Sequence, residues 1–335
     1  MATLETVHLQ TAREQLLSRR ERLETVLEEH PTDQLNQLLS QVDEALQRID
    51  NGQFGLCTVC HDTVEADRLL RDPMISVCLG CLSPSQQRAL EFDLELAARI
   101  QNGLLPAPDL AIPGWQIAYH YRPAGVIGGD YFDVLGDGKG GAYFLIADVA
   151  GKGVAAAMLT ANLRAVFRAL LPMELGVEET LLRANRLFCE GKLSTQYATL
   201  VFGHSSAAGK MQLVNAGHLP ALLVRGSEIT RLESSCMPLG MFADQEFVPT
   251  SFNLRLGDML VLYTDGISEA QEPTGEEYGV CKLEAAIREK FGECPEILVK
   301  NCRDRLQEYR NGTERADDET LLAIQYMGAA ATASA

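Results

Sequence analysis

Apolar residues near the N-terminus recur at helical spacing. One set is separated by steps of three and four residues, at Leu35, Leu38, Leu39, Val42, Ala45, Leu46 and Ile49. This period places the set on one face of an α-helix, and that face needs an apolar partner. A matching stripe precedes it at Leu9, Leu16, Leu23 and Leu27. Because His30-Pro31-Thr32-Asp33 is typical of a turn followed by a helix N-cap, the pattern predicts an antiparallel helical hairpin. The alternative is a self-associating coiled coil.

A third helical pattern begins at Ser83-Pro84-Ser85, where serine is a good N-cap and proline suits the first turn. Its apolar face runs through Leu90, Leu94, Ala97, Ile100 and Leu104, and Pro106 and Pro108 end it. The pattern predicts a linker helix over residues 83–108 that forms a dimer seam. The alternative is that this helix packs against the domain that follows it.

From Trp115 onward, short β-branched or aromatic runs alternate with glycine turns and a few helices. The clearest predicted strands are Ala142 to Ile146, Met259 to Tyr263 and Leu321 to Tyr326, and a helix of about 18 residues opens at Gly153. This alternation predicts an α/β layered domain rich in antiparallel sheet.

Composition narrows the class of protein. Hydrophobic residues make up 46% and charged residues 22% of the 335 residues, which is the balance of a soluble globular protein. No apolar run reaches the about 20 residues that cross a bilayer, and no export signal is evident, so we expect a cytoplasmic protein without a membrane partner. The net charge of −17 argues against a general nucleic-acid surface and favours proteins or cations as partners.

Four of the nine cysteines form two close pairs, Cys57-x2-Cys60 and Cys78-x2-Cys81. This spacing predicts a tetrahedral zinc site, and because four sulfur ligands leave no open position, the zinc is expected to be structural. Folding of this small unit should depend on the metal. An alternative is that the zinc site is a redox sensor, since zinc-bound thiolates can be oxidised and release the ion.

Four acidic motifs mark the layered domain: Gly128-Gly129-Asp130-x2-Asp133, Asp148-Val149-Ala150-Gly151-Lys152-Gly153, Thr264-Asp265-Gly266 and Asp317-Asp318-x-Thr320. Each motif alone is typical of a turn. Together, carboxylates without a matching His or Cys set favour hard cations such as Mg²⁺ or Mn²⁺. Two such ions can activate water for an in-line displacement at phosphorus.

The order and wording of these motifs resemble the bacterial SpoIIE/RsbU branch of the metal-dependent (type 2C, PPM) protein serine/threonine phosphatases, over roughly residues 95 to 327. The resemblance also includes the helix Ala97-Ala98-Arg99-Ile100-Gln101, Leu105-Pro106, Arg122-Pro123-Ala124, Tyr197-Ala198-Thr199, Asn215-Ala216-Gly217-His218, Pro238-Leu239-Gly240 and Gly257-Asp258. It implies an α+β fold, a four-layer α-β-β-α sandwich, and hydrolysis by water activated by two metal ions. The implied substrate is a regulatory phosphoprotein, typically an anti-sigma factor antagonist, in bacterial signal transduction such as a stress response.

The resemblance also implies roles for individual residues. Asp130 would bridge two Mn²⁺ or Mg²⁺ ions, Asp265 and Asp317 would complete one of them, and Asp148 with the Val149 carbonyl would serve the other. Asp133 and Asp318 would cap turns or support the ligands, and the alternative is that either of them is itself a metal ligand. His218 would hold a structural hydrogen bond, or alternatively donate a proton to the leaving oxygen. Contact between Arg122 and the phosphate is a further alternative.

The segment from Ala45 to Cys81 resembles the zinc finger of the DksA/TraR family, whose hairpins enter the RNA polymerase secondary channel. The tip here, Glu28 to Asp33, lacks the family's spaced aspartate pair, so a docking or sensory use is an equal expectation. The alternative function is accordingly a polymerase-binding regulator with the phosphatase fold as scaffold. The predicted division is a zinc hairpin over 1–82, the linker over 83–108, the phosphatase domain over 109–328 and a flexible tail over 329–335.

Overall fold

The computed structural model describes residues 2–29, 31–107, 110–190 and 196–328. The chain divides into two compact units, Met1–Asp93 and Leu94–Ala335, and the division falls inside helix α4 (Pro84–Asn102). The second half of the predicted linker helix therefore belongs to the larger unit. The predicted tail, 329–335, lies outside the described residues.

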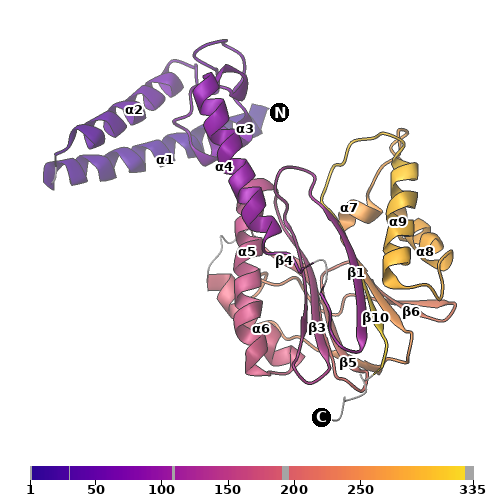
Figure 1. The fold of residues 1–335 in the computed structure, drawn as a ribbon. Helices are drawn as coiled ribbons and strands as arrows, with labels where there is room; N and C mark the ends of the chain where they lie inside the picture. Colours follow the sequence, from indigo (N-terminus) through magenta and orange to yellow (C-terminus); the bar gives the residue numbers. More distant parts are fainter. Residues whose placement is uncertain (1, 30, 108–109, 191–195, 329–335) are drawn as a thin grey trace. The chain divides into compact units, whose positions relative to one another are not determined.

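The smaller unit contains the predicted hairpin of α1 (Ala2–Glu29) and α2 (Asp33–Asp50) (Figure 1). Thr32 caps α2, because its hydroxyl accepts a hydrogen bond from the Leu35 N–H at 3.3 Å. The core between the helices is built on Leu16, Val42, Ala45 and Ile49. Since these two apolar stripes pack on each other within one chain, the prediction of a hairpin is confirmed.

A short segment that carries the four paired cysteines follows α2, with α3 (Ala66–Arg71) and the 3₁₀ turn η1 (Leu79–Cys81). Arg48 of α2 holds this segment by donating to the backbone carbonyls of Met74 (2.9 Å) and Ile75 (3.2 Å).

Helix α4 begins as predicted, with the Ser83 hydroxyl accepting from the Gln86 N–H. Its end differs from the prediction. The helix stops at Asn102, so Leu104 lies beyond it in a turn rather than on its apolar face. Gly103 follows the last helical residue, and glycine commonly ends a helix before any proline does so.

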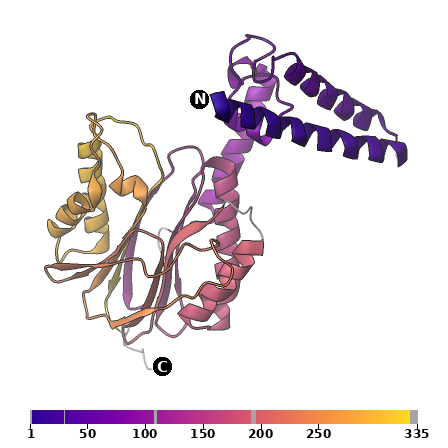
Figure 2. The same cartoon turned by 180° about the vertical axis from the view of Figure 1, so that it is seen from behind.

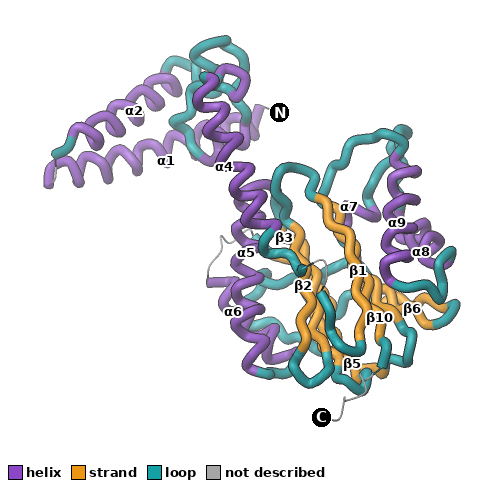
Figure 3. The backbone as a smooth tube through the Cα atoms, viewed as in Figure 1, coloured by secondary structure: helices purple, strands orange, loops and turns teal. Residues whose placement is uncertain are grey.

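The larger unit is built on two five-stranded antiparallel sheets (Figure 3). The first sheet has the order β1 (Trp115–Arg122), β10 (Glu319–Tyr326), β9 (Met259–Tyr263), β6 (Ala221–Arg225) and β7 (Glu228–Leu232). The second has the order β2 (Asp130–Gly136), β3 (Ala142–Val149), β4 (Ala198–Ser205), β5 (Lys210–Ala216) and β8 (Thr250–Asn253). The first sheet joins the beginning of the domain to its end, because β1 pairs with β10.

Helices cover the outer face of each sheet (Figure 2). The second sheet is covered by α5 (Gly153–Leu170), η2 (Leu171–Met173) and α6 (Val177–Glu190), and the first by α8 (Gly279–Arg288) and α9 (Pro295–Arg310). Three apolar cores separate the layers, and Phe167, Phe132 and Leu298 each represent one. The predicted α+β fold with α-β-β-α layers is confirmed.

Among the described residues, one helix, Gly153–Met173, is long and apolar enough by length and composition to cross a membrane. In the structure this helix is α5 with η2, and Leu159, Leu163 and Phe167 on it belong to the core against the second sheet. A core helix of a layered domain meets the same test of length and composition.

Candidate active site

Carboxylates from four separated segments lie within electrostatic reach of one another. Asp130 opens β2 and stands opposite Asp148 of β3 in the ladder. Asp265 opens the short helix α7 (Asp265–Ser268) directly after β9, and Asp317 lies just before β10. The charges of Asp265 and Asp317 both act on Asp148. The structure therefore gathers the four acidic motifs that the sequence contains far apart.

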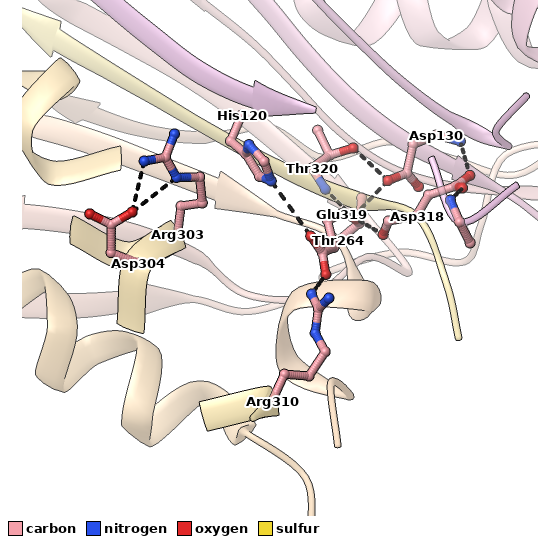
Figure 4. A network of polar contacts seen from close by, with 10 residues as sticks. His120, Asp130, Thr264, Arg303, Asp304, Arg310, Asp318, Glu319 and Thr320 are labelled. Atoms are coloured by element: carbon pink, nitrogen blue, oxygen red, sulfur yellow. Dashed lines mark hydrogen bonds and ion pairs between the residues drawn. The ribbon is translucent and has the colours of Figure 1, made fainter. Parts of the chain in front are cut away.

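Asp130 is the most enclosed of these carboxylates, with 2% of its surface exposed. Its Oδ2 accepts hydrogen bonds from the hydroxyls of Thr264, at 2.8 Å, and Thr320 (Figure 4). Burial raises the pKa of Asp130 well above its usual range, and the charges of Asp148 and Asp318 add to the effect. A buried carboxylate in this position requires a proton or a cation.

Asp148 and Asp265 are half-buried, and neighbouring carboxylates repel the charged form of each. Burial raises the pKa of Asp148 to about 7, with Asp265 and Asp317 as further causes. The pKa of Asp265 is also raised, first by burial and then by Asp317. A gathering of carboxylates that raise one another's pKa is the arrangement that a divalent cation relieves, and an all-oxygen donor set suits Mg²⁺ or Mn²⁺.

Asp318 organises the backbone beside this pocket. Its two carboxylate oxygens accept from the N–H groups of Ala124 (2.7 Å) and Gly129 (2.6 Å), and the Asp130 N–H lies 3.4 Å away. A Cβ on Gly128 would collide with the Asp318 carboxylate, which explains the first glycine of the pair. Asp318 is thus a positioning residue that fixes the turn before Asp130.

Two further glycines allow close backbone approach. A Cβ on Gly129 would lie 3.2 Å from the carbonyl oxygen of Val149, the carbonyl that the sequence proposed as a metal ligand. A Cβ on Gly266 would collide with the backbone carbonyl of Asp318. Glycine at position 266 therefore lets α7, which carries Asp265, approach the segment that carries Asp317.

Lys152 adds the one positive charge that pairs with a ligand candidate among the described residues. Its ammonium lies 2.7 Å from the Asp317 carboxylate and donates to the Ala316 carbonyl at 2.9 Å. Lys152 and Asp317 line a cavity of about 410 Å³ whose wall also includes Leu94, Val126 and Val154. Asp317 therefore borders a space that can admit an amino-acid side chain.

Asp133 lies away from this pocket. It is three residues from Asp130 on the same strand, and odd spacing on a strand turns side chains to opposite faces. Its carboxylate binds Arg168 of α5 through two hydrogen bonds of 2.7 Å, and it accepts another from the Tyr131 hydroxyl at 3.1 Å. Asp133 thus ties the second sheet to α5 rather than supporting the ligands, which corrects the expectation.

His218 is buried in a fixed, neutral form. Its Nε2 lies 3.0 Å from the Tyr263 carbonyl, which can only accept, so Nδ1 accepts from the Thr199 hydroxyl at 2.8 Å. Burial lowers the pKa of His218 to about 4, so near neutral pH it is not the imidazolium that a proton donor to the leaving oxygen would have to be. Of the two expected roles, the geometry fits the structural one, and the bond to Tyr263 steadies the strand end before Asp265.

Sequence reasoning missed three partners of the pocket. Thr264 and Thr320 were part of the motifs but were given no role, although both bind Asp130. Gln101 of α4 belongs to the family resemblance but was given no role, yet its side chain exchanges two hydrogen bonds with the backbone of Gly128, at 2.7 and 3.0 Å. The apolar pattern of the helix does not indicate this contact, because Gln101 and Gly128 are 27 positions apart.

The four paired cysteines form the other site. Their sulfur atoms all lie within 4.8 Å of one another. The backbone N–H groups of Cys60 and Cys78 point at the Cys57 sulfur and lower the pKa of that thiol to about 6. A sulfur set this close, with one sulfur already favoured as a thiolate, fits a tetrahedral zinc ion.

Comparison with known proteins gives a consistent picture for the larger unit. Residues 138–327 match the family described as Stage II sporulation protein E (SpoIIE). The chain is 28% identical over 262 residues to Protein IcfG of Synechocystis sp. (strain ATCC 27184 / PCC 6803 / Kazusa), covering 70% of this chain and 41% of that protein. It is 26% identical over 238 residues to Phosphoserine phosphatase RsbP of Bacillus subtilis (strain 168), covering 69% of this chain and 57% of that protein.

Among solved structures, the SiaA-PP2C domain of Pseudomonas aeruginosa superimposes with a TM-score of 0.64 at 20% identity. The match covers 72% of this chain and 98% of that domain, and it shows a shared fold. The chain spans 41% and 57% of the lengths of the two relatives named above, so the likeness concerns one part of each of those proteins.

Proposed function

This chain belongs to the SpoIIE family, and from that premise we propose that it is a metal-dependent protein serine/threonine phosphatase. The observation that carries the proposal is the convergence of Asp130, Asp148, Asp265 and Asp317 beside a cavity, where burial and neighbouring carboxylates raise the pKa of the first three. Carboxylates that repel one another weaken a fold unless a ligand relieves the repulsion, so the arrangement favours a working site over a disused scaffold.

The donor set fits two Mg²⁺ or Mn²⁺ ions. Asp130 would contact both, Asp265 and Asp317 would hold one, and Asp148 with the Val149 carbonyl would hold the other. Ions of this kind lower the pKa of water and neutralise charge on phosphoryl oxygens. The chain supplies the rest: the Thr264 and Thr320 hydroxyls orient Asp130, and Asp318 fixes the turn before it.

The substrate that we propose is a phosphoserine or phosphothreonine of a regulatory protein, specifically an anti-sigma factor antagonist. Three features support this: the family, the relative named Phosphoserine phosphatase, and the cavity beside Asp317, which has room for an extended side chain. A cytoplasmic location and a role in a stress response complete the proposal.

The test is phosphate release from a phosphoserine peptide by the full chain, with and without Mn²⁺. We expect release only with the metal, and Asp265→Ala or Asp317→Ala should lower it by at least about 100-fold. Asp244→Ala removes an exposed loop carboxylate as the matched control and should retain activity. Undiminished turnover in Asp265→Ala, with native circular dichroism, would refute the assignment.

For the smaller unit we propose one structural zinc ion on Cys57, Cys60, Cys78 and Cys81. The likeness of this unit to DksA/TraR proteins, and with it RNA polymerase binding as an alternative function, stays a prediction. Binding of the full chain to purified RNA polymerase core enzyme would test that alternative.

We also propose that α4 mediates a homodimer. Leu96 and Ile100 are separated by one helical turn and expose 41% and 59% of their surfaces. Apolar pairs at this spacing on an exposed helix are typical of a dimer seam. Sedimentation of wild type and Ile100→Glu tests this, because the variant should sediment as a monomer.

A further inference from the structure

A cluster of arginines lies on the opposite face of β10 from the acidic pocket. We define the basic cluster as Arg122, Arg310 and Arg315. Arg122 ends β1, Arg310 is the last residue of α9, and Arg315 lies in the loop that leads from α9 to β10. Arg122 stands opposite Glu319 in the β1–β10 ladder. Such a concentration of guanidinium groups is notable in a chain with a net charge of −17.

Within the described part of the chain, the basic cluster contains more guanidinium groups than ion pairs. Glu319 forms an ion pair with Arg310, and its other oxygen lies 3.5 Å from the Nε2 of His120 (Figure 4). Over the described ranges, neither Arg122 nor Arg315 forms an ion pair or a hydrogen bond. The Nε atoms of Arg310 and Arg315 are buried, and neither has a hydrogen-bond partner in the described structure.

The positive charges act against one another. Burial lowers the pKa of Arg310, and Arg315 and Arg122 lower it further. His120 adds no charge, because burial and the nearby arginines lower its pKa to about 4. Of these three guanidinium groups, Arg310 alone forms an ion pair within the described residues, and a buried donor without an acceptor costs stability.

Arg303 differs from the arginines of the basic cluster because its guanidinium group has a carboxylate partner of its own. It lies on α9 near the same face, but both of its hydrogen bonds go to the carboxylate of Asp304, at 2.7 and 3.1 Å. Figure 4 shows this pair separate from the contacts around Glu319. Arg303 is therefore a satisfied, half-exposed arginine and a matched control for the cluster.

The basic cluster is close in sequence and space to the proposed metal ligands. Glu319 lies between Asp318 and Thr320 on β10, and those two neighbours point the other way and take part in the Asp130 network. Arg315 precedes Asp317 by two residues. An anion on the cluster would therefore sit beside the acidic pocket, but separated from Asp130 by the strand.

We propose that the basic cluster is an anion subsite that binds an oxyanion of the carboxylate or phosphate class. Guanidinium groups bind such oxyanions through paired N–H donors, and the unpartnered Nε atoms are donors of this kind. On the premise of the function proposed above, the occupant is a second acidic group of the phosphoprotein, distinct from the phosphoryl group under attack. The other source of the same chemistry is free phosphate.

The first test is independent of catalysis. Thermal unfolding of the metal-free full chain is measured with increasing inorganic phosphate, for wild type, Arg315→Gln and Arg303→Gln. We expect phosphate to raise the melting temperature of wild type and Arg303→Gln, with little or no rise for Arg315→Gln. Equal shifts in all three proteins, or no shift in wild type, would overturn the anion subsite.

The second test identifies the source of the anion. Two phosphoserine peptides that differ only in flanking Glu or Gln residues are compared by their KM values with Mn²⁺ present. Wild type and Arg303→Gln should favour the Glu peptide by about 3- to 10-fold, and Arg315→Gln should bring the ratio close to one. A ratio near one in wild type, with the phosphate shift intact, overturns the substrate assignment and supports free phosphate as the occupant.

The melting-temperature test and the peptide test can fail independently, so failure of this inference can be told from failure of the proposed function. If neither peptide is hydrolysed by wild type, the phosphatase assignment fails. The thermal arm then still decides whether the basic cluster binds an oxyanion.

Discussion

Asp130 and Asp148 stand directly opposite each other across the β2–β3 ladder, so two carboxylates occupy one cross-strand pair. Like charges in this position destabilise a sheet. The pair persists beside Asp265 and Asp317, whose charges also act on Asp148. The carboxylates therefore repel one another in the metal-free protein, and a bound cation would replace this repulsion by attraction.

This arrangement predicts opposite effects for two similar substitutions. Asp148→Asn should raise the stability of the metal-free protein by about 1 kcal/mol, because it removes one of the repelling charges, and it should abolish activity. Asp318→Asn should lower stability by about 1–3 kcal/mol, because an amide cannot accept from both the Ala124 and Gly129 N–H groups. Urea unfolding of the zinc-containing chain without added Mn²⁺ or Mg²⁺ measures both. A loss of stability in Asp148→Asn equal to that of Asp318→Asn would contradict the account.

Gly266→Ala should disable the site without touching a carboxylate. The added methyl group would collide with the Asp318 carbonyl, so α7 and the segment carrying Asp317 must move apart. We expect Mn²⁺-dependent turnover to fall by at least about 100-fold, since small displacements of ligands have effects of this size. Gly176→Ala, at a glycine with no atom within 4 Å of an added Cβ, is the control and should behave as wild type.

His218 predicts a specific pH dependence of stability. Its pKa is lowered to about 4 in the folded protein, so between pH 6.5 and 4 the unfolded chain binds a proton that the folded protein does not. His218 therefore lowers stability as the pH falls through this window, by up to about 3 kcal/mol.

The acidic pocket has the opposite tendency, because its raised carboxyl pKa values favour the folded state at low pH. The informative quantity is consequently the difference between wild type and His218→Gln. Unfolding free energies of both proteins at pH 7.5 and pH 5 should show a smaller loss on acidification for the variant. An identical pH dependence in the two proteins would contradict a neutral, buried His218.

The cysteine cluster predicts one zinc ion per chain and a fold that depends on it. Cys57→Ser should lose the metal and unfold the segment around α3, because so small a core depends on the zinc for stability. Elemental analysis and hydrogen exchange measure these effects. Cys294→Ser, at a cysteine outside the cluster, should keep both the zinc and the protection.

Much of the fold follows from local pattern. The strand Met259–Tyr263 and the helix opening at Gly153 were predicted with their observed starts, because their periods and flanking glycines are local signals. Contacts between segments that are distant in the sequence could not be predicted in this way. Thr320 reaches Asp130 across 190 positions, and no property of either residue alone indicates the contact.

Asp133 is a residue whose sequence context suggested the wrong role. Its place in the motif with Asp130 suggested a shared role, but the pleat of β2 sends the two carboxylates to opposite faces. Arg168, the partner that decides the role of Asp133, lies 35 residues away on α5. The basic cluster could not be predicted from the sequence either, because Arg122 and Arg315 are brought close together only by the pairing of the first and last strands.

The most direct test of the central claim is calorimetric titration with Mn²⁺ of the full chain that keeps its zinc and holds no other divalent cation. We expect wild type to bind two ions beyond the zinc, and Asp130→Asn, which alters the carboxylate proposed to contact both, to lose binding at both positions. No manganese uptake by wild type, or unchanged uptake by Asp130→Asn, would contradict the claim that these carboxylates form a paired metal site.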